Sequence, residues 1–489
     1  MRAAPGPRLS TGAPAGAIAA ACASPGDWLG ALERRACAAP RSVAISEVGP
    51  SGRVTASVTA EQLAAHCAAR AREMSGSLHA GAAVLLALPS GIDLAAWMVG
   101  ALAAGLRAVL MHPRCTGAEI ARAAGIAGAS VVIRDGAGAG AAGLSTRLAK
   151  RAPGSVILSS SGTTGLPRLA EREAPALNAD AAAVAEGLRL TPDDVVLCIP
   201  PLCHSYGVDL LLGALASGAE LRVMGEYDGA GAAAQLGAGV TVLPGIPFVF
   251  ESLLRMGPAG AARPRLAVSA GAPLADAVRE GFRERWGVDV GQLYGATELG
   301  TVAVHRPDEP DFDPGSVGRP VGGASFLLVE VEDGGPPGRG VGELAVRAPS
   351  MLSRYLDGDV PLRDGHFLTG DLARVDSSGR AWVCGRRKLL IDVGGFKVNP
   401  LEVEAALREH PGVADCAVAP IALSETVRRV RAFIVPVDPA GPPKERELRA
   451  FLRERLSAVK VPRVFECVAA LPRSPTGKLL RSRLPGAAC

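Results

Sequence analysis

The stretch Leu158-Ser-Ser-Ser-Gly-Thr-Thr-Gly-Leu-Pro-Arg168 decides how the rest of this 489-residue chain is interpreted. The apolar residues up to Leu158 have the pattern of a strand that ends where the serines begin. Glycines let backbone N–H groups approach a ligand closely, and hydroxyls add further donors. Such a run forms a nest for anions, and Arg168 adds a permanent positive charge whose planar fork matches phosphate oxygens. The stretch therefore predicts a polyphosphate-binding loop.

Taken alone, the stretch also fits a solvated turn, and it lacks the Gly-Lys-Ser/Thr ending of a P-loop. It resembles the phosphate loop of the adenylate-forming superfamily, which includes acyl-CoA synthetases, aryl-CoA ligases, peptide-synthetase adenylation domains and luciferase. That loop normally ends in Pro-Lys-Gly, whereas Arg168 here keeps the charge but changes its shape. The resemblance assigns ATP binding to Ser160, Ser161, Gly162, Thr163, Thr164, Gly165 and Arg168, with a catalytic role for Thr163.

Composition sets the class of protein. A chain of 489 residues is too long for one compact core, and 48% hydrophobic content suits a large globular protein. The net charge of +4 is spread over both signs, so nothing demands nucleic acid or an anionic membrane. Ten cysteines without a CxxC pair favour a reduced, cytoplasmic protein. The apolar run 92–111 contains Asp93 and Arg107, so we expect a buried helix and strand there, not a membrane span.

Hydrophobic runs divide the chain into regions. Residues 1–26 are rich in Ala, Gly and Pro and predict a disordered start. From 27 to 386, short apolar strands alternate with helices, which is typical of parallel-rich sheets flanked by helices. Alternating strands over 315–385 indicate a small β subdomain, and 387–489 a small α+β domain. The expected class is α/β, with an ATP- and acyl-binding N-terminal domain and a mobile C-terminal domain that carries a catalytic lysine.

Gly138-Ala-Gly140-Ala-Ala-Gly143 matches the GxGxxG pattern of dinucleotide-binding turns. No acidic residue follows at the expected spacing, and the glycines lie in an Ala/Gly-rich run. A flexible loop is therefore the better interpretation than an NAD-binding oxidoreductase, which is kept as an alternative of another class.

A second signature of the superfamily is Gln292-Leu-Tyr-Gly-Ala-Thr-Glu298. Tyr294 offers a ring for adenine, Thr297 a hydroxyl for the α-phosphate, and Glu298 a hard oxygen ligand for Mg²⁺. On its own this run also fits a strand end followed by a helix cap. The resemblance adds Gly295 to the ATP site, together with the adenine-pocket turn Gly271, Ala272 and Pro273.

Three later motifs follow in the order of the superfamily. Asp371 and Arg386 match its ribose-binding pair, and Lys388 stands at its hinge. The run Gly394-Gly-Phe-Lys-Val-Asn-Pro-Leu-Glu-Val-Glu404 resembles the acyl-CoA synthetase loop that admits the pantetheine arm, which implies CoA contacts for Gly394, Gly395, Phe396 and Lys397. Lys478, held in a Pro/Gly turn, matches the catalytic lysine. Leu389 and Asp392 depart from the acid and the lysine that are common there.

The run after the strand 195–199 supplies the expected acid-binding pocket. His204 stands where the superfamily has a gate near the substrate carboxylate, although a single histidine is more often a packed core residue. The helix after it should form a pocket wall. The expected pocket residues are His204, Tyr206, Asp209, Leu210, Ala270, Gly295 and Gly300.

Asp209 stands out because it interrupts an apolar run. A carboxylate there must face solvent, pair with a cation or meet a polar group of the substrate, since an unpaired buried charge is costly. We expect it to cap or flank the amino end of the helix, where the helix dipole favours an acid. The alternative is a substrate with a hydroxyl or amino group near Asp209.

Together the motifs imply a two-step ligase. A carboxylic acid and ATP with Mg²⁺ give acyl-adenylate and pyrophosphate, and the thiol of CoA then displaces AMP. An acyl-AMP ligase that loads an acyl carrier protein is the near alternative, and a non-catalytic binding relative is a third possibility. The retention of Glu298, Asp371, Arg386 and Lys478 argues against the third. The sequence does not identify the acid.

Overall fold

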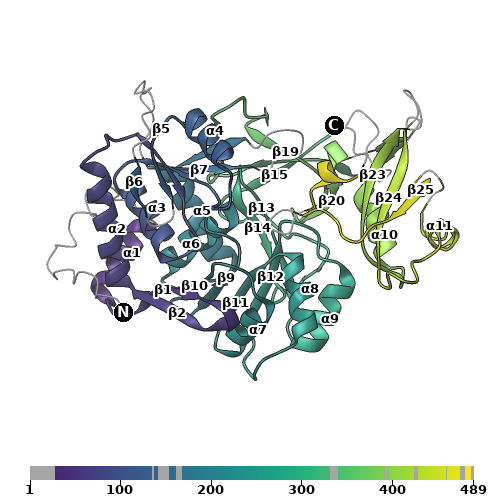
Figure 1. Ribbon diagram of the computed structural model, residues 1–489, viewed down its shortest axis with the longest axis horizontal. Helices are drawn as coiled ribbons and strands as arrows, with labels where there is room; N and C mark the ends of the chain where they lie inside the picture. Colours follow the sequence, from purple (N-terminus) through teal and green to yellow (C-terminus); the bar gives the residue numbers. More distant parts are fainter. Residues whose placement is uncertain are drawn as a thin grey trace, which may run out of the picture.

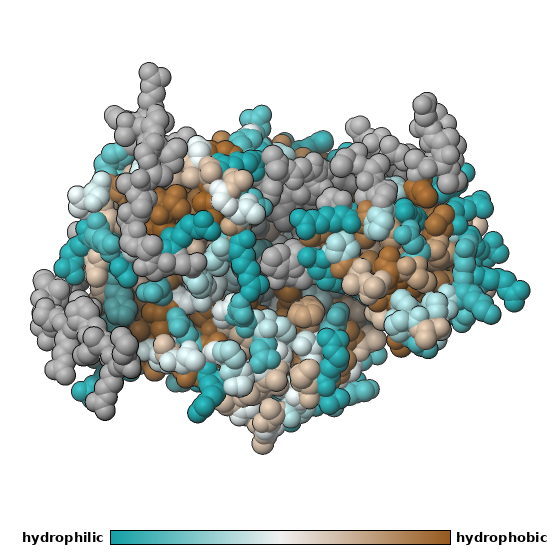
Figure 2. Space-filling view, viewed as in Figure 1, coloured by the Kyte–Doolittle hydropathy of each residue, from teal (hydrophilic) through white to brown (hydrophobic). Residues whose placement is uncertain are grey.

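The structure is a computed structural model that describes residues 28–134, 137–140, 154–160, 168–330, 340–389, 391–393, 396–422, 428–456, 458, 460–473 and 479–485. The chain forms a large domain and a smaller C-terminal lobe, which lie side by side in Figure 1. On the face shown in Figure 2, hydrophilic residues are spread over both lobes, with hydrophobic residues in small groups between them.

The first large sheet carries the strands that flank the phosphate loop. Its order is β17-β8-β7-β4-β3-β5-β6, and β3, β4, β5 and β7 are parallel. The bounds are β3 Ala83–Ala87, β4 Arg107–Leu110, β5 Ala129–Arg134, β6 Ala137–Gly140, β7 Ser155–Ser159, β8 Leu169–Glu173 and β17 Arg354–Tyr355.

The second sheet has the order β14-β13-β12-β11-β9-β10-β1-β2, and only its outermost pairs are antiparallel. Its core strands are therefore parallel, as the alternation of strands and helices predicted. The bounds are β1 Val43–Val48, β2 Val54–Thr59, β9 Val195–Cys198, β10 Glu220–Met224, β11 Val242–Gly245, β12 Leu266–Ala270, β13 Val290–Ala296 and β14 Gly300–His305.

Helices cover these sheets, and three of them fill the space between the two. Residues of α3, α5 and α6 share one core with residues of both sheets, and Figure 1 shows α3, α5 and α6 among the strands. A helix buried on all sides is expected to be mostly apolar, and α6 is, with Asp209 as its one charged residue. The helices are α1 Trp28–Ala38, α2 Ala60–Ser75, α3 Ile92–Ala103, α4 Gly117–Ala127, α5 Ala174–Gly187, α6 Ser205–Ser217, α7 Gly229–Gly237, α8 Pro247–Met256 and α9 Asp276–Trp286.

Local sequence explains where several helices begin. Thr59 and Gln62 form a capping box at the start of α2, and Thr116 and Glu119 form one at the start of α4. The charge at Arg107, inside the apolar run, is paired: its guanidinium donates to both oxygens of the buried Glu171 at 2.6 and 3.3 Å. No described helix is long and apolar enough to cross a membrane.

The predicted β subdomain is present as a sheet of antiparallel strands that follows β14 in the chain. It ends with β20, which leads to the hinge predicted at residue 388. The strands are β15 Ser325–Val329, β16 Val341–Arg347, β18 Leu362–Arg363, β19 His366–Val375 and β20 Ala381–Arg386.

The C-terminal lobe has its own hydrophobic core, as a separate α+β domain requires. A three-stranded sheet, β23-β24-β25, packs with α10, while the short hairpin β21–β22 contacts β24. The bounds are β21 Ile391–Val393, β22 Phe396–Val398, α10 Pro400–Arg408, β23 Val413–Ala422, β24 Arg428–Pro436, α11 Glu445–Arg453 and β25 Val464–Cys467.

Candidate functional site

The predicted phosphate loop connects two strands of a hairpin. β7 and β8 pair antiparallel, and the Ser160 N–H closes the turn by donating to the Arg168 carbonyl at 2.8 Å. A P-loop would instead connect a strand to a helix, so the topology agrees with the missing Gly-Lys-Ser/Thr ending. The predicted residues Ser161, Gly162, Thr163, Thr164 and Gly165 lie outside the described part of the chain.

Arg168 lies against an aromatic ring at the end of this hairpin. Its guanidinium carbon is 3.5 Å from the centre of the Tyr355 ring, and its Nη2 donates to the Asp359 carbonyl at 2.9 Å. A planar guanidinium can stack on a ring and donate hydrogen bonds at once, which a lysine ammonium does less well. The replacement of the usual lysine by Arg168 is thus matched by a partner on the strand β17.

The same tyrosine holds the predicted metal ligand. The Tyr355 hydroxyl donates to Oε1 of Glu298 at 2.6 Å, and the Leu352 N–H donates to the Glu298 carbonyl at 2.7 Å. Burial, followed by the charge of Glu298, raises the pKa of Tyr355, so its hydroxyl remains a donor. Glu298 is half-buried, and its fixed carboxylate suits a hard divalent cation such as Mg²⁺.

Thr297 and Glu298 lie in the turn between β13 and β14, not in a helix cap. Across this turn, the hydroxyls of Thr297 and Ser205 are 3.5 Å apart. Because Ser205 begins α6, the second signature and the expected acid pocket meet at the carboxyl ends of β9 and β13. Ligands bind at this edge of open α/β sheets.

The predicted nucleoside residues also form a connected set. The Tyr294 hydroxyl donates to Oδ2 of Asp371 at 2.7 Å, and Arg386 Nε is 2.6 Å from Oδ1 of the same carboxylate. Burial, followed by Asp371, raises the pKa of Tyr294 well above its ordinary value. Antiparallel pairing of β19 with β20 places Asp371 opposite Arg386, which explains why their spacing in sequence is informative.

The adenine-pocket turn of the superfamily falls on an exposed segment here. Gly271, Ala272 and Pro273 directly follow β12 and are exposed to solvent. Gly271 has φ of 81°, a conformation that favours glycine over other residues. Because β12 is parallel to β13, this turn leaves the same edge of the sheet as Tyr294.

His204 is exposed and caps α6, accepting a hydrogen bond from the Tyr206 N–H on Nδ1 at 3.3 Å. The packed-core interpretation of His204 is therefore wrong. The expected pocket residues Tyr206, Asp209, Leu210 and Ala270 are buried. Among the described residues, the hydroxyls of Tyr206 and of the buried Thr301 on β14 have no hydrogen-bond partner.

Asp209 does not cap the helix, because His204 has that position. Its Oδ1 accepts a hydrogen bond from Arg172 Nη1 at 3.0 Å, and Arg172 Nη2 forms an ion pair with Asp180. The expectation of a cap is wrong because β8 and α5 bring a cation beneath α6. Burial, followed by Asp180, raises the pKa of Asp209 well above its ordinary value. We call Arg172, Asp180 and Asp209 the buried triad.

The triad also shapes β14, where the expected pocket residue Gly300 lies. Gly300 has φ of 69°, and a Cβ atom there would stand 2.5 Å from Asp180 Oδ1 and 2.6 Å from Arg172 Nη2. Asp180 Oδ1 accepts from the Thr301 N–H at 2.9 Å. The triad therefore ties α5 and α6 to the strand that follows the second signature.

The site residues predicted between positions 388 and 478 are described only in part. Gly394, Gly395 and Lys478 lie outside the described residues, and Lys388, Phe396 and Lys397 are described by their backbone alone. Near the predicted hinge, Asn399 Nδ2 donates to the Cys384 carbonyl at 2.7 Å. This bond joins the loop predicted to admit pantetheine to the strand that precedes Lys388.

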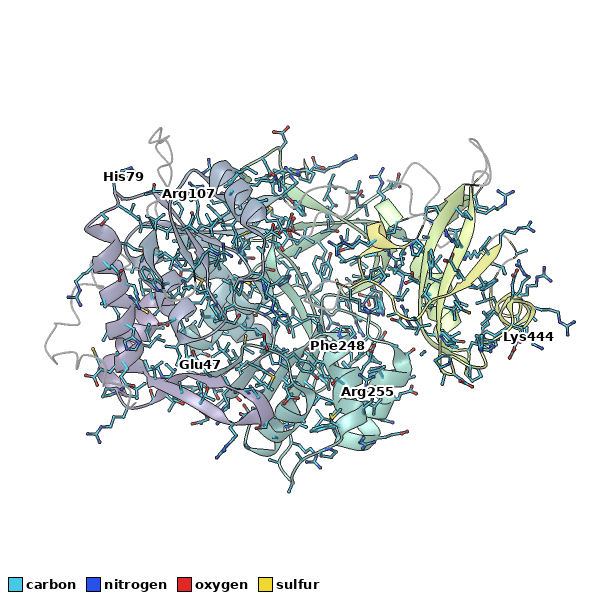
Figure 3. The ribbon with its side chains drawn as sticks, viewed as in Figure 1. Glu47, His79, Arg107, Phe248, Arg255 and Lys444 are labelled. Atoms are coloured by element: carbon cyan, nitrogen blue, oxygen red, sulfur yellow. The ribbon has the colours of Figure 1, made fainter. Side chains whose placement is uncertain are left out.

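The large domain faces the C-terminal lobe through α8. Burial, followed by the charge of Asp415, raises the pKa of Glu251, and Arg473 and Arg408 oppose that shift. Asp415, Arg473 and Arg408 belong to the C-terminal lobe, so charges of the two lobes lie close together. Figure 3 labels Phe248 and Arg255 on α8, and Lys444 on the far side of the C-terminal lobe.

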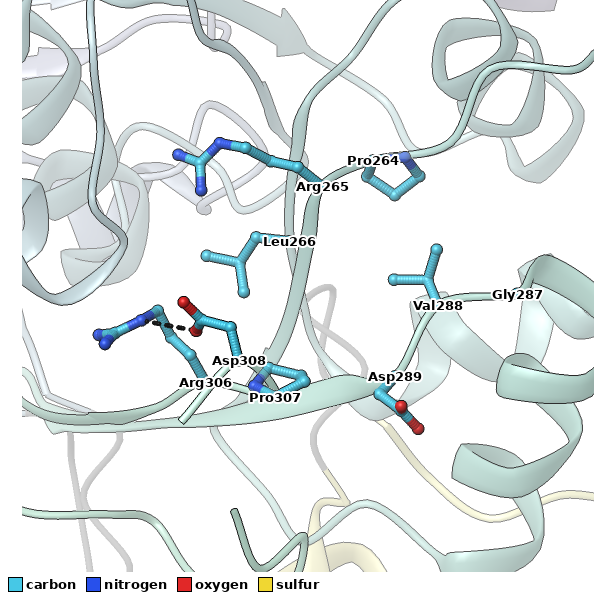
Figure 4. A pocket seen from close by; sticks show the side chains of 9 residues that line it. All are labelled: Pro264, Arg265, Leu266, Gly287, Val288, Asp289, Arg306, Pro307 and Asp308. Atoms are coloured by element: carbon cyan, nitrogen blue, oxygen red, sulfur yellow. Dashed lines mark hydrogen bonds and ion pairs between the residues drawn. The ribbon is translucent and has the colours of Figure 1, made fainter. Parts of the chain in front are cut away.

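A pocket of about 470 Å³ lies at the opposite edge of the second sheet. It is lined by residues before β12 and β13 and after β14, including Arg265, Asp289 and Arg306 (Figure 4). Arg265 is already paired with Asp194, and Arg306 with Asp308. This pocket is therefore separate from the residues predicted to bind ATP.

Tyr355 and Arg172 are two of the site residues that were not predicted from sequence. Tyr355 lies in a short segment without a known motif, although an aromatic residue shortly before Asp357 and Asp359 was an available signal. Arg172 lies in the charged run Arg168–Glu173, a pattern that predicts a solvent-exposed surface. The GxGxxG pattern places Gly138 and Gly140 in β6, an edge strand antiparallel to β5, which is not the strand-to-helix turn of a dinucleotide site.

Comparison with known proteins finds two family models that match the chain. The family model "AMP-binding enzyme" matches residues 146–356, and "AMP-binding enzyme C-terminal domain" matches 402–478. A 4-coumarate–CoA ligase of Oryza sativa is 28% identical over 455 residues, which cover 83% of this chain and 84% of that protein. A p-hydroxybenzoic acid–AMP ligase of Mycobacterium tuberculosis is 33% identical over 440 residues, which cover 83% of this chain but only 62% of that protein.

Among solved structures, o-succinylbenzoate CoA synthetase of Bacillus subtilis with its acyl-adenylate has a TM-score of 0.81. It is 23% identical, and the match covers 95% of this chain and 99% of that one. This likeness confirms the predicted two-domain α/β fold.

Proposed function

Because the chain belongs to the adenylate-forming superfamily of AMP-binding enzymes, we propose that it is a ligase that activates a carboxylic acid with ATP and transfers the acyl group to CoA. In the first step the acid's carboxylate attacks the α-phosphate of ATP and pyrophosphate leaves. In the second, the thiol of CoA attacks the acyl carbon and AMP leaves.

The observation that carries this proposal is the chain of contacts Arg168–Tyr355–Glu298. It joins the end of the phosphate loop to the second signature through a ring contact of 3.5 Å and a hydrogen bond of 2.6 Å. A phosphate-binding cation and a metal-binding carboxylate are thus fixed relative to each other before ligand binds. Such preorganisation is the main way in which enzymes stabilise developing charge.

Each group has a role in the first step. Glu298 would hold Mg²⁺, which when bound offsets phosphate charge. Arg168 and the Ser160 N–H border the loop for the outer phosphates. Asp371 accepts hydrogen bonds from the ribose hydroxyls, and Arg386 donates to them. Lys478 neutralises charge between the substrate carboxylate and the α-phosphate. Because two anions react, neutralisation and in-line placement provide most of the rate.

The substrate is proposed to be an aromatic acid with a hydroxyl group. Tyr206 and Thr301 each have a buried hydroxyl without a described hydrogen-bond partner, and an unsatisfied buried polar group costs about 1–3 kcal/mol. A hydroxyl on the substrate is the kind of group that would give such a hydroxyl its missing partner. Two relatives are named for 4-coumarate and p-hydroxybenzoic acid, which supports this class.

Pyrophosphate release across a panel of acids, with and without CoA, tests the reaction. We expect ATP-dependent release with hydroxylated aromatic acids and an acyl-CoA product when CoA is added. The alternative, transfer to an acyl carrier protein, predicts product with a phosphopantetheinylated carrier and none with CoA. Absence of release with every acid would contradict the proposal.

Matched pairs of acids test the substrate class. A site built to bond a hydroxyl can reject the analogue that lacks it by roughly 10⁴-fold. We expect Tyr206→Phe to reduce that preference, with Tyr227→Phe as the control tyrosine remote from α6. Equal kcat/KM for the hydroxylated and plain acids in the unmodified enzyme would contradict the hydroxyl assignment while leaving the ligase reaction in place.

A further inference from the structure

We infer that the segment after β14 holds a binding site for a divalent transition-metal ion of the zinc class. The ligands are His305, Glu309 and Asp311, whose donor atoms lie within 4.8 Å of one another. This site is separate from Glu298 and from the proposed ligase reaction. It lies next to the pocket of Figure 4, whose wall includes Arg306 and Asp308 from the same segment.

The buried histidine is the observation that points to a ligand. His305 is fully buried, and its Nε2 has no hydrogen-bond partner among the described residues. This Nε2 atom lies 3.9 Å from Oε2 of Glu309, which is too long for a hydrogen bond. A buried nitrogen without a partner is costly, and a cation between this nitrogen and the carboxylate would supply one.

The other ring nitrogen is arranged as in metal-binding histidines. Nδ1 of His305 lies 3.4 Å from the Ser316 carbonyl, and the Phe312 ring packs edge-on against the imidazole. A carbonyl can only accept, so this contact places the proton of a neutral ring on Nδ1 and leaves the Nε2 lone pair free. Histidines that bind metals typically donate their second nitrogen in this way.

Hydrogen bonds from neighbouring arginines hold the two carboxylates in place. Oε1 of Glu309 accepts from the Arg306 N–H at 3.1 Å, and Oδ2 of Asp311 accepts from Arg319 and Arg380 at 2.6 and 2.7 Å. The arginines therefore bind one oxygen of each carboxylate. The other oxygen of Glu309, Oε2, is the one near His305.

The ligand set selects the kind of metal. One imidazole with two carboxylates suits zinc or a similar transition ion, whereas Mg²⁺ and Ca²⁺ prefer oxygen ligands alone. Ligand atoms on a tetrahedral zinc ion lie roughly 3.4 Å apart, so the cluster must close by roughly 1 Å. Glu309 and Asp311 are half-buried, which leaves room for that movement.

A bound ion would stabilise the connection between the second large sheet, which contains β14, and the sheet of the β subdomain, which contains β20. The segment after His305 pairs with β20 through Gly318 and Ala381, and Asp313 accepts from the Trp382 indole at 2.8 Å. β20 ends at Arg386, just before the predicted hinge. The ion therefore has a structural role, which does not depend on ATP.

Calorimetric titration of the full chain with ZnCl₂, after removal of metals and without ATP, tests the site. We expect one zinc ion to bind per chain and zinc to raise the Tm. We expect MgCl₂ to show no binding at this site. Glu309→Gln should weaken zinc binding at least tenfold. Asp308→Asn removes the same charge one residue earlier, outside the cluster, and should bind zinc as the unmodified chain does.

His305→Gln is the second test, with circular dichroism to confirm folding. If this variant does not fold, Glu309→Gln at a half-buried position still decides the question. Zinc binding that is unchanged in Glu309→Gln would indicate binding to cysteine thiols and would overturn the inference. Absence of zinc binding by the unmodified chain would overturn it as well.

Discussion

The Tyr355 hydroxyl donates a 2.6 Å hydrogen bond to Glu298, the carboxylate proposed to bind Mg²⁺. Removing the hydroxyl in Tyr355→Phe leaves the Arg168 stack in place but frees the carboxylate to rotate. Hydrogen bonds to charged groups contribute about 1.5–3 kcal/mol, so we expect the Mg²⁺ concentration for half-maximal pyrophosphate release to rise roughly tenfold or more.

Tyr227→Phe is the control for this experiment, because the Tyr227 hydroxyl lies 3.5 Å from the Val249 carbonyl and away from Glu298. Calorimetry with Mg²⁺ and a non-hydrolysable ATP analogue gives a second readout that does not depend on turnover. The same Mg²⁺ dependence in Tyr355→Phe and Tyr227→Phe would show that Tyr355 does not position Glu298.

Lys478→Ala should nearly abolish acyl-adenylate formation, because this lysine is proposed to neutralise the charge between the two reacting anions. The second step does not join two anions, so transfer from supplied acyl-AMP to CoA should be much less affected. Measuring both half-reactions separately checks this division. Equal losses in the two would contradict it.

Lys388→Pro should separate the two steps in another way. Proline fixes φ near roughly −65° and removes an N–H, so a pivot that must change its dihedral angles cannot do so. We expect pyrophosphate release to remain and thioester formation to fail. Lys388→Ala is the matched control, since it removes the side chain but leaves the backbone free. If Lys388→Pro performs both steps at normal rates, the pivot lies at another residue.

The sequence predicted the fold well because its signals are local. Buried parallel strands read as short apolar runs, and loops at their carboxyl ends contain the motif residues. Asp371 and Arg386 were both expected at the ribose, and the antiparallel register of β19 and β20 places them opposite each other.

What the sequence did not predict depends on contacts between distant segments. Asp209 meets Arg172, which is 37 positions away, across a layer boundary that no periodicity reveals. Tyr355 reaches Glu298 and Arg168 only because β17 pairs with β8. Local propensity favoured a helix cap for Asp209, but tertiary packing placed it beside a buried cation.

The buried triad leads to a prediction about pH. Burial, followed by the charge of Asp180, raises the pKa of Asp209 well above its ordinary value. The folded state therefore keeps a proton that the unfolded state loses above pH ~3.9. Since the folded state then binds more protons, the free energy of unfolding falls as pH rises from there toward the folded pKa, by about 1.4 kcal/mol for each pH unit.

Asp209→Asn should remove this pH dependence. The amide has the shape of the protonated acid: its oxygen can accept from Arg172 and its NH₂ can donate to Asp180. We expect the variant to be at least as stable as the unmodified protein at pH 7, and its denaturant midpoint to change less between pH 5 and 8. Asp180→Asn is the contrasting variant, because it weakens the ion pair of the fully buried Arg172. Removing one partner of a buried pair costs about 3–5 kcal/mol. Equal destabilisation in both variants at pH 7 would show that Asp209 is ionised in the folded protein.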